Sequence, residues 1–260
     1  MSDAAAATID ACANCGTPLA GAFCHACGQH HPTPRFTLHS LLGQVPQVLF
    51  NVDRSLFDTV RKLTLHPGQV IREYLDGRRV RYVNPLTLLT TLCGLSALGY
   101  ALYPFDYGPI AAGVPAPYRD AYIGMFRMTF EYYTPLMTLL LPLAAAITRV
   151  VFRGRGRGYG EHLVANAYLF SIVNLISLAV LPLCIAGNGS HWFQLAWMLS
   201  TIPIFGYQVW ATHDAFSVPE RVVGDVVRAL FAVLAFYTVE MAVMALFAIA
   251  YLVHARLQAG

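Results

Sequence analysis

Apolar residues are distributed unevenly along this 260-residue chain, and from residue 84 onward they form long runs separated by short polar stretches. A helix needs about 20 mainly apolar residues to cross the hydrocarbon core of a membrane. Five runs have about this length: Pro85–Tyr103, Thr134–Phe152, Leu163–Ala186, Trp192–Ala211 and Ala229–Val253. The pattern therefore predicts an all-α integral membrane protein in which residues 84–260 form a bundle of five transmembrane helices.

Ahead of this bundle, residues 31–83 have an amphipathic pattern. Within residues 37–65 the apolar positions recur at steps of three and four, as on one face of a helix, although Pro46 interrupts them. Because this segment is too short and too interrupted to cross a membrane, we expect a juxtamembrane amphipathic helix on the membrane surface or under the bundle. Pro67 is expected to end it, and residues 70–75 to form a further short helix.

The composition agrees with a membrane protein. Hydrophobic residues make up 57% of the chain and charged residues only 12%, whereas an ordinary soluble domain has about 25% charged residues. So few charges cannot cover the surface of a globular protein of this size, and a soluble enzyme is not expected.

The net charge of +3 is small, but the positions of the 17 basic residues predict an orientation. Short loops on the cytosolic side of a membrane are enriched in lysine and arginine. Residues 1–83 hold eight basic residues, and the loops after the second and fourth predicted spans, with the adjoining helix ends, hold six more. The opposite side has only Arg119, Arg127 and Arg256. This asymmetry places the N-terminus in the cytosol and the C-terminus outside.

Four of the six cysteines lie near the N-terminus, in Cys12-Ala-Asn-Cys15-Gly and Cys24-His-Ala-Cys27-Gly. The two-residue spacing lets both thiolates of a pair bind one tetrahedral zinc ion. The alternatives are two disulfides or a redox pair, but a cytosolic location disfavours persistent disulfides. We predict a zinc ribbon in residues 12–30 that binds a structural Zn²⁺ through all four cysteines, after a disordered tail (residues 1–11). Four ligands leave no open position for water, so catalysis at this metal is not expected.

Four arginines precede the first predicted span: Arg72, Arg78, Arg79 and Arg81. One interpretation is a positive anchor that contacts lipid phosphates, and the other is a binding site for a headgroup or a phosphorylated ligand. The three arginines of the Arg153-Gly-Arg-Gly-Arg157 run are interpreted as charges that set the topology, and no nucleic-acid partner is expected.

A single carboxylate, Glu240, lies near the centre of a predicted span, the fifth. A charged group there is costly unless it is protonated, paired or directed at a polar cavity. It is a candidate proton or cation relay, or a neutral acid hydrogen-bonded to a neighbouring helix. Its candidate polar partners are Asn166, Asn174, Gln208 and Tyr237.

Two pairs of acidic residues and histidines are predicted on the cytosolic side. Glu161-His162 opens the third span and His213-Asp214 closes the fourth. Together with the arginines they are candidates for an interfacial acid–base or metal site, although charges favoured at helix ends explain them equally well.

Two blocks of sequence are similar to the bacterial domain-of-unknown-function family 3667. The first comprises the two cysteine pairs with Phe23 and Gln29, and the second runs Pro67-Gly-Gln-Val-Ile-Arg-Glu-Tyr-Leu-Asp-Gly-Arg-Arg-Val-Arg-Tyr-Val-Asn-Pro85. Tyr159-Gly-Glu-His162 matches more weakly. The resemblance implies a multi-pass protein of the bacterial cytoplasmic membrane, and it implies no settled activity.

Three functional hypotheses follow. The first, which we favour, is a non-enzymatic scaffold or adaptor that contacts membrane lipid and recruits a cytosolic protein through its zinc ribbon. The second is a transporter or permeation pathway that uses Glu240. The third is an enzyme that acts on a lipid at the cytosolic interface. The sequence leaves the oligomeric state open.

Overall fold

The computed structural model describes residues 11–33, 36, 55–103, 105–218 and 222–259, and the regular structure within these ranges is helical, without a strand. The main part of the predicted amphipathic segment, residues 37–54, lies outside them. The helices are α2 (Ser55–Leu65), α3 (Pro67–Leu75), α4 (Pro85–Leu102), η2 (Gly108–Ala111), α5 (Ala116–Leu139), α6 (Leu141–Val151), α7 (Tyr159–Ala186), α8 (His191–Phe216) and α9 (Val222–Ala259).

Three of the described helices are long and apolar enough to cross a membrane, namely α4, α7 and the Val222–Tyr251 part of α9. A bent pair, Tyr132–Leu139 with Leu141–Val151, makes up to four. These segments support a membrane protein, but the predicted number of five spans is not confirmed. The predicted fourth span lies within α8, which packs between α7 and α9.

The second predicted span is not one straight helix, and this corrects the prediction from hydropathy. Helix α5 begins at Ala116, well ahead of the predicted Thr134, and the chain bends by 49° between Leu139 and Leu141. Pro142 is the second residue after the break, and a proline lacks the N–H that would continue the hydrogen bonds of the preceding helix. The apolar pattern identified the segment but could not reveal the bend.

Helix α7 lies at the centre of the bundle, where it packs against α4, α6 and α8. Almost every residue from Gly160 to Asn174 is buried, and such a helix is apolar on all sides because it has neighbours on all sides. A second, smaller apolar cluster lies where α4 and α7 end and α8 begins. It contains Tyr100, Phe105, Tyr107, Phe130, Leu181, Cys184 and Phe193.

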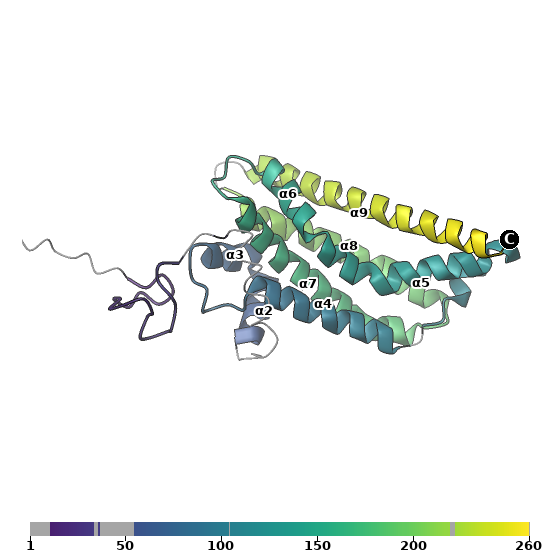
Figure 1. Ribbon diagram of the computed structural model, residues 1–260, viewed down its shortest axis with the longest axis horizontal. Helices are drawn as coiled ribbons and strands as arrows, with labels where there is room; N and C mark the ends of the chain where they lie inside the picture. Colours follow the sequence, from purple (N-terminus) through teal and green to yellow (C-terminus); the bar gives the residue numbers. More distant parts are fainter. Residues whose placement is uncertain (1–10, 34–35, 37–54, 104, 219–221, 260) are drawn as a thin grey trace, which may run out of the picture.

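The bundle is elongated (Figure 1), with α3 at one end and the C-terminus of α9 at the other. We call the end at α3 the collar end and the opposite one the far end. Helix α9 contacts α5, α6 and α8, but toward the far end it exposes large apolar side chains, including Met241, Leu246, Phe247, Ile249 and Val253.

Two short helices precede the bundle and form, with the connection to α4, a segment that we call the collar (residues 55–84). Helix α3 begins at Pro67, three residues earlier than predicted. Proline suits the first position of a helix because its missing N–H would have no intrahelical partner there. The predicted break at Pro67 therefore separates α2 from α3. Asn84 ends the collar by capping α4, since its side chain accepts hydrogen bonds from the backbone N–H groups of Leu86 and Thr87.

Candidate functional site

The four N-terminal cysteines come together at one point in the segment that we call the head (residues 11–33). Their sulfur atoms all lie within 4.8 Å of one another, with Cys12 Sγ 3.6 Å from Cys27 Sγ and Cys15 Sγ 3.5 Å from Cys24 Sγ. Zinc–sulfur bonds of about 2.3 Å in a tetrahedron hold sulfurs about 3.8 Å apart. The thiols therefore fit a single metal ion.

The backbone around the cysteines has the conformation that this arrangement requires. Gly16 and Gly28 have φ angles of +76° and +74°, a region in which a residue with a Cβ is strained. Their N–H groups donate to the carbonyl oxygens of Cys12 and Cys24, closing two equivalent turns. Hydrogen bonds with Thr17 lower the pKa of the Cys15 thiol to about 6, whereas burial raises the pKa of the Cys24 thiol to about 11.

A glutamine two residues after Cys27 attaches the head to the collar. Gln29 is buried, and its side-chain amide donates to the carbonyl oxygen of Gly77 at 2.7 Å. Its amide oxygen accepts from the backbone N–H groups of Arg79 at 3.1 Å and Val80 at 3.4 Å. The side chain of Gln29 thus pairs with a backbone carbonyl and with backbone N–H groups of the turn after α3. The head is therefore docked on the collar.

Aromatic rings connect the collar to the central helix. Phe36 stacks on Tyr74 with 5.6 Å between ring centroids, and Tyr74 meets Tyr168 of α7 edge to face at 5.4 Å. The guanidinium of Arg79 lies 3.8 Å from the centroid of Phe36. A Cβ on Gly160 would overlap the backbone of Phe36, so the start of α7 must be glycine for this contact to form.

The arginines that were interpreted as a lipid anchor or as a phosphate site have partners within the protein. Arg78 and Arg81 both lie 3.4 Å from the carboxylate of Glu73, which also accepts from the hydroxyl of Tyr82 at 2.7 Å and from Gln69. Burial alone would raise the pKa of Glu73, but these hydrogen bonds and charges hold it below its usual range. Burial, followed by the hydrogen bond to Glu73, raises the pKa of Tyr82 to about 12.

Arg72, the fourth of these arginines, pairs with α8. Its guanidinium contacts the carboxylate and the backbone carbonyl of Asp214. The backbone N–H of Gly68 donates to the same carboxylate at 2.7 Å, and a Cβ on Gly68 would overlap the backbone of Asp214. The predicted proximity of Arg72 and Asp214 is therefore present, as an ion pair that fixes α3 on α8.

The other members of the predicted interfacial site have separate surroundings. Glu161 accepts from the backbone N–H of Gly158 at 2.6 Å and so caps its own helix. His162 is buried, stacks on Phe216 and hydrogen-bonds with Thr148 at 3.1 Å. The Nε2 atom of His213 is buried without a partner among the described residues. Of these four residues, Asp214 is the one that contacts the predicted arginines.

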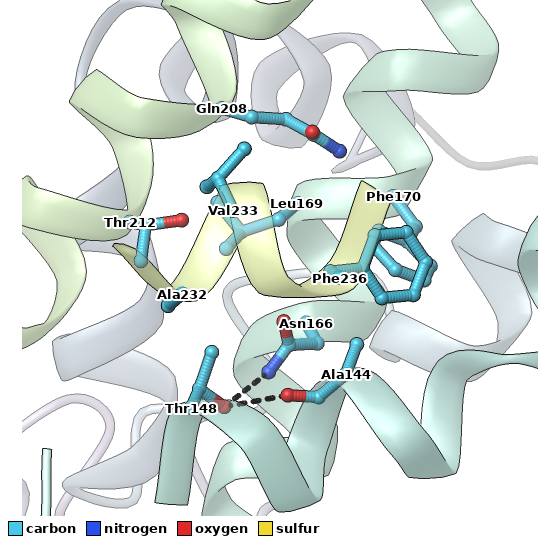
Figure 2. Close-up of a pocket in the computed structure, with 10 residues that line it drawn as sticks. All are labelled: Ala144, Thr148, Asn166, Leu169, Phe170, Gln208, Thr212, Ala232, Val233 and Phe236. Atoms are coloured by element: carbon cyan, nitrogen blue, oxygen red, sulfur yellow. Dashed lines mark hydrogen bonds between the residues drawn. The ribbon is translucent and has the colours of Figure 1, made fainter. Parts of the chain in front are cut away.

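Buried polar side chains gather around a small cavity of about 20 Å³ between α6, α7, α8 and α9. Figure 2 shows Thr148 and Asn166 on one side of it and Gln208 and Thr212 on the other. Asn166 donates to the hydroxyl of Thr148 at 2.9 Å. The cavity has the size and polarity that one buried water needs. Two predicted partners of Glu240, Asn166 and Gln208, thus belong to a different cavity.

Glu240 lies near the middle of α9 with only 2% of its surface exposed. It lines a groove of about 720 Å³ between α5, α7, α8 and α9. Its Oε1 atom has no hydrogen-bond partner among the described residues. Of the predicted partners, Tyr237 lines the same groove, whereas the amide of Asn174 donates to Phe170 within α7.

Several residues that hold these regions together were not identified from the sequence. Gln29 belongs to the Cys-Gly-Gln run of the block of cysteine pairs, so its position contained a signal. The position of Asp225 contained no such signal. Asp225 lies fully buried at the start of α9, with Arg155 at 2.7 Å and Arg228 at 3.1 Å. Arg157 likewise joins Asp76 to the collar end of α7. Thus two arginines of the run at 153–157 form specific ion pairs.

Comparison with known protein families identifies a match. The model of a family described as "Protein of unknown function (DUF3667)" matches residues 53–96. These residues include α2, α3 and the first part of α4. Neither a curated protein nor a solved structure matches the chain. The predicted resemblance to DUF3667 is therefore confirmed over residues 53–96, which contain the block from Pro67 to Pro85, whereas the cysteine block and Tyr159–His162 lie outside the match.

Proposed function

We propose that this protein is a membrane scaffold whose head binds a structural zinc ion and presents a rigid protein-binding surface on the cytosolic face of a bacterial cytoplasmic membrane. The observation that carries the proposal is the docking of the head through Gln29. A head on a flexible tether could only capture a partner, whereas a docked head also orients it relative to the membrane.

The metal makes such a head possible. The described residues of the head bury few apolar side chains, so they have little hydrophobic surface to stabilise a fold, and in such small domains metal binding supplies the folding free energy. The sulfur separations of 3.5 and 3.6 Å agree with one tetrahedral ion. With four protein ligands the ion has a structural role and no open position for a reaction.

The surface of the head offers a point of contact for a partner. Phe23 is 64% exposed, and its ring makes an edge-to-face contact with the ring of His30, with 4.9 Å between the centroids. An exposed aromatic ring held rigidly is a typical anchor in protein interfaces. The positively charged residues of the collar and of residues 149–157 support the cytosolic orientation.

A photo-crosslinking experiment in intact cells tests the proposal. A benzophenone amino acid replaces Phe23 in one form of the full chain and Phe57, an equally bulky exposed residue of α2, in the control. We expect a discrete protein adduct from position 23, which is lost when Cys24→Ser and Cys27→Ser remove the metal. The purified parent chain should contain about one zinc ion per molecule.

A second variant separates docking from metal binding. Gln29→Ala should retain zinc, because Gln29 is not a ligand, yet it should reduce the adduct at position 23 because the head is no longer oriented. Equal adducts from positions 23 and 57, or an adduct that persists without the cysteines, would overturn the scaffold proposal.

The two alternative functions receive unequal support. The buried carboxylate of Glu240 in an open groove favours the transport hypothesis, which Glu240→Gln tests by loss of flux with retention of the fold. The lipid-acting enzyme has less support, because Arg72, Arg78 and Arg81 are engaged by Asp214 and Glu73.

A further inference from the structure

The groove at Glu240 has the dimensions of a ligand site. Its volume of about 720 Å³ lies within the range of small-molecule pockets, about 300–1,000 Å³. It adjoins a second hollow of about 460 Å³, and Met125, Met244 and Ala248 line both. The second hollow continues along α9 to Tyr251. Since a helix rises 1.5 Å per residue, the distance along α9 from Glu240 to Tyr251 is about 16 Å.

The lining of the groove is polar at one end and apolar along the rest. At the level of Glu240 it includes the hydroxyl-bearing residues Tyr133, Ser177, Ser200 and Tyr237. Further along α9 it consists of apolar residues such as Met244, Phe247 and Ala248. Methionines make such a surface adaptable, because their unbranched side chains fit different shapes.

Glu240 is the feature of the groove that calls for a ligand. The side chain is buried, lines the groove and leaves its Oε1 atom without a hydrogen bond. No lysine, arginine or histidine is among the residues that line either hollow. Acidic side chains within a bundle of membrane helices are costly unless they are paired, and this carboxylate has no positive partner among the residues around it.

We propose that the groove binds an amphipathic amine, with the protonated amine at Glu240 and the apolar chain along α5 and α9 toward Tyr251. A protonated amine supplies both the charge and the N–H donors that Glu240 lacks. The apolar body fits the remainder of the groove, which lies among helices that expose apolar side chains to the surrounding lipid. The inference is independent of the role of the head.

The test uses the full chain in phosphatidylcholine nanodiscs and a dodecylamine that carries a diazirine near the end of its chain. Irradiation should label α9 between Met241 and Tyr251 and the facing part of α5. Unlabelled dodecylamine should prevent labelling at a concentration about ten- to a hundredfold lower than dodecanol, because a charged hydrogen bond is stronger than a neutral one. Dodecanoate should compete least of the three, because its charge repels Glu240.

Three variants identify the origin of the effect. Glu240→Gln should abolish the preference for the amine over dodecanol. Thr238→Val, on an exposed position of the same helix, should leave the preference unchanged. If the Glu240 variant fails to fold, Ala248→Trp should fill the apolar part of the groove and remove labelling while Glu240 remains.

Each other outcome contradicts the proposal. Equal competition by amine and dodecanoate indicates simple partition into the bilayer. Equal competition by amine and dodecanol indicates a neutral ligand. If label is absent from the groove, the groove does not bind an amphipathic amine.

Discussion

Two buried acidic residues, one at the collar end of the bundle and one in the middle of α9, differ in whether their carboxylate oxygens have partners. At the collar end, the carboxylate of Asp225 interacts with two arginines and the backbone N–H of Val218. In the middle of α9, Glu240 is equally buried but its Oε1 atom is without a partner. Buried polar groups are normally satisfied, so the first arrangement stabilises the fold, whereas the second reduces stability.

The largest effect is expected when the paired carboxylate, that of Asp225, is removed. Asp225→Ala removes a fully buried carboxylate and leaves Arg155, whose side chain is only 15% exposed, without its partner. Breaking a buried ion pair costs about 3–5 kcal/mol, so we expect a loss of that order in the free energy of unfolding, measured in a denaturant titration of the purified protein. Asp120→Ala, at an exposed position of α5, is the control and should change stability by less than about 0.5 kcal/mol.

A second substitution tests the contact between the collar and α8. In Gly68→Ala the new Cβ overlaps the backbone of Asp214, so α3 must move away and the Arg72 ion pair must weaken. Overpacking of this kind costs about 1–3 kcal/mol. Gly94→Ala is the matched control, because its Cβ would meet no atom within 4 Å and alanine favours a helix. Equal stability of the two variants would show that the approach of α3 to α8 is not required.

Removal of the unpaired acid, Glu240, should change the free energy of unfolding in the opposite direction. Glu240→Met replaces the unpaired acid by an apolar side chain of similar length, and the unfolding free energy should rise by about 1 kcal/mol, because leaving a polar group unpaired in the interior costs 1–3 kcal/mol. The same denaturant titration measures it. A marked loss of stability would mean that Glu240 supports the fold and would remove the contrast with Asp225.

The smallest expected effect concerns pH at the collar. Because the pKa of Glu73 is lowered in the folded protein, its contribution to stability is present above the unfolded value of about 4.3 and is lost as the pH falls through the folded pKa. Amide exchange of residues 78–83, corrected for its intrinsic pH dependence, should therefore become faster below about pH 4. In Glu73→Gln this additional acceleration should be absent, and its persistence would assign the effect to another group.

The elements of this protein were predictable where a single physical property decides them. Long apolar runs located α4, α7 and α9, because burial in hydrocarbon requires an uninterrupted apolar segment. The spacing of the cysteines predicted that they would meet, because two residues between ligands suit one tetrahedral ion. The bend before Pro142 was missed, although the proline was visible, because membrane helices tolerate some prolines without bending sharply.

The candidate sites were less predictable, because they depend on contacts between distant parts of the chain. The arginines before α4 were interpreted as a lipid anchor or as a phosphate-binding site, yet Arg72 pairs with a residue 142 positions further along. Glu240 was correctly singled out as a buried acid, but Asn166 and Gln208 lie at a different cavity from it. Composition indicates that a polar group needs a partner and does not indicate which group is within reach.

The amino-acid sequence by itself therefore determined the class of protein, the apolar helices and the four candidate metal ligands, since hydrophobicity and ligand spacing act locally along the chain. Only the tertiary structure decided that Gln29 docks the head on the collar, that the arginines are paired and that Glu240 faces an open groove. These outcomes depend on the packing of side chains from separate helices, where displacements of a few ångströms determine whether a hydrogen bond forms.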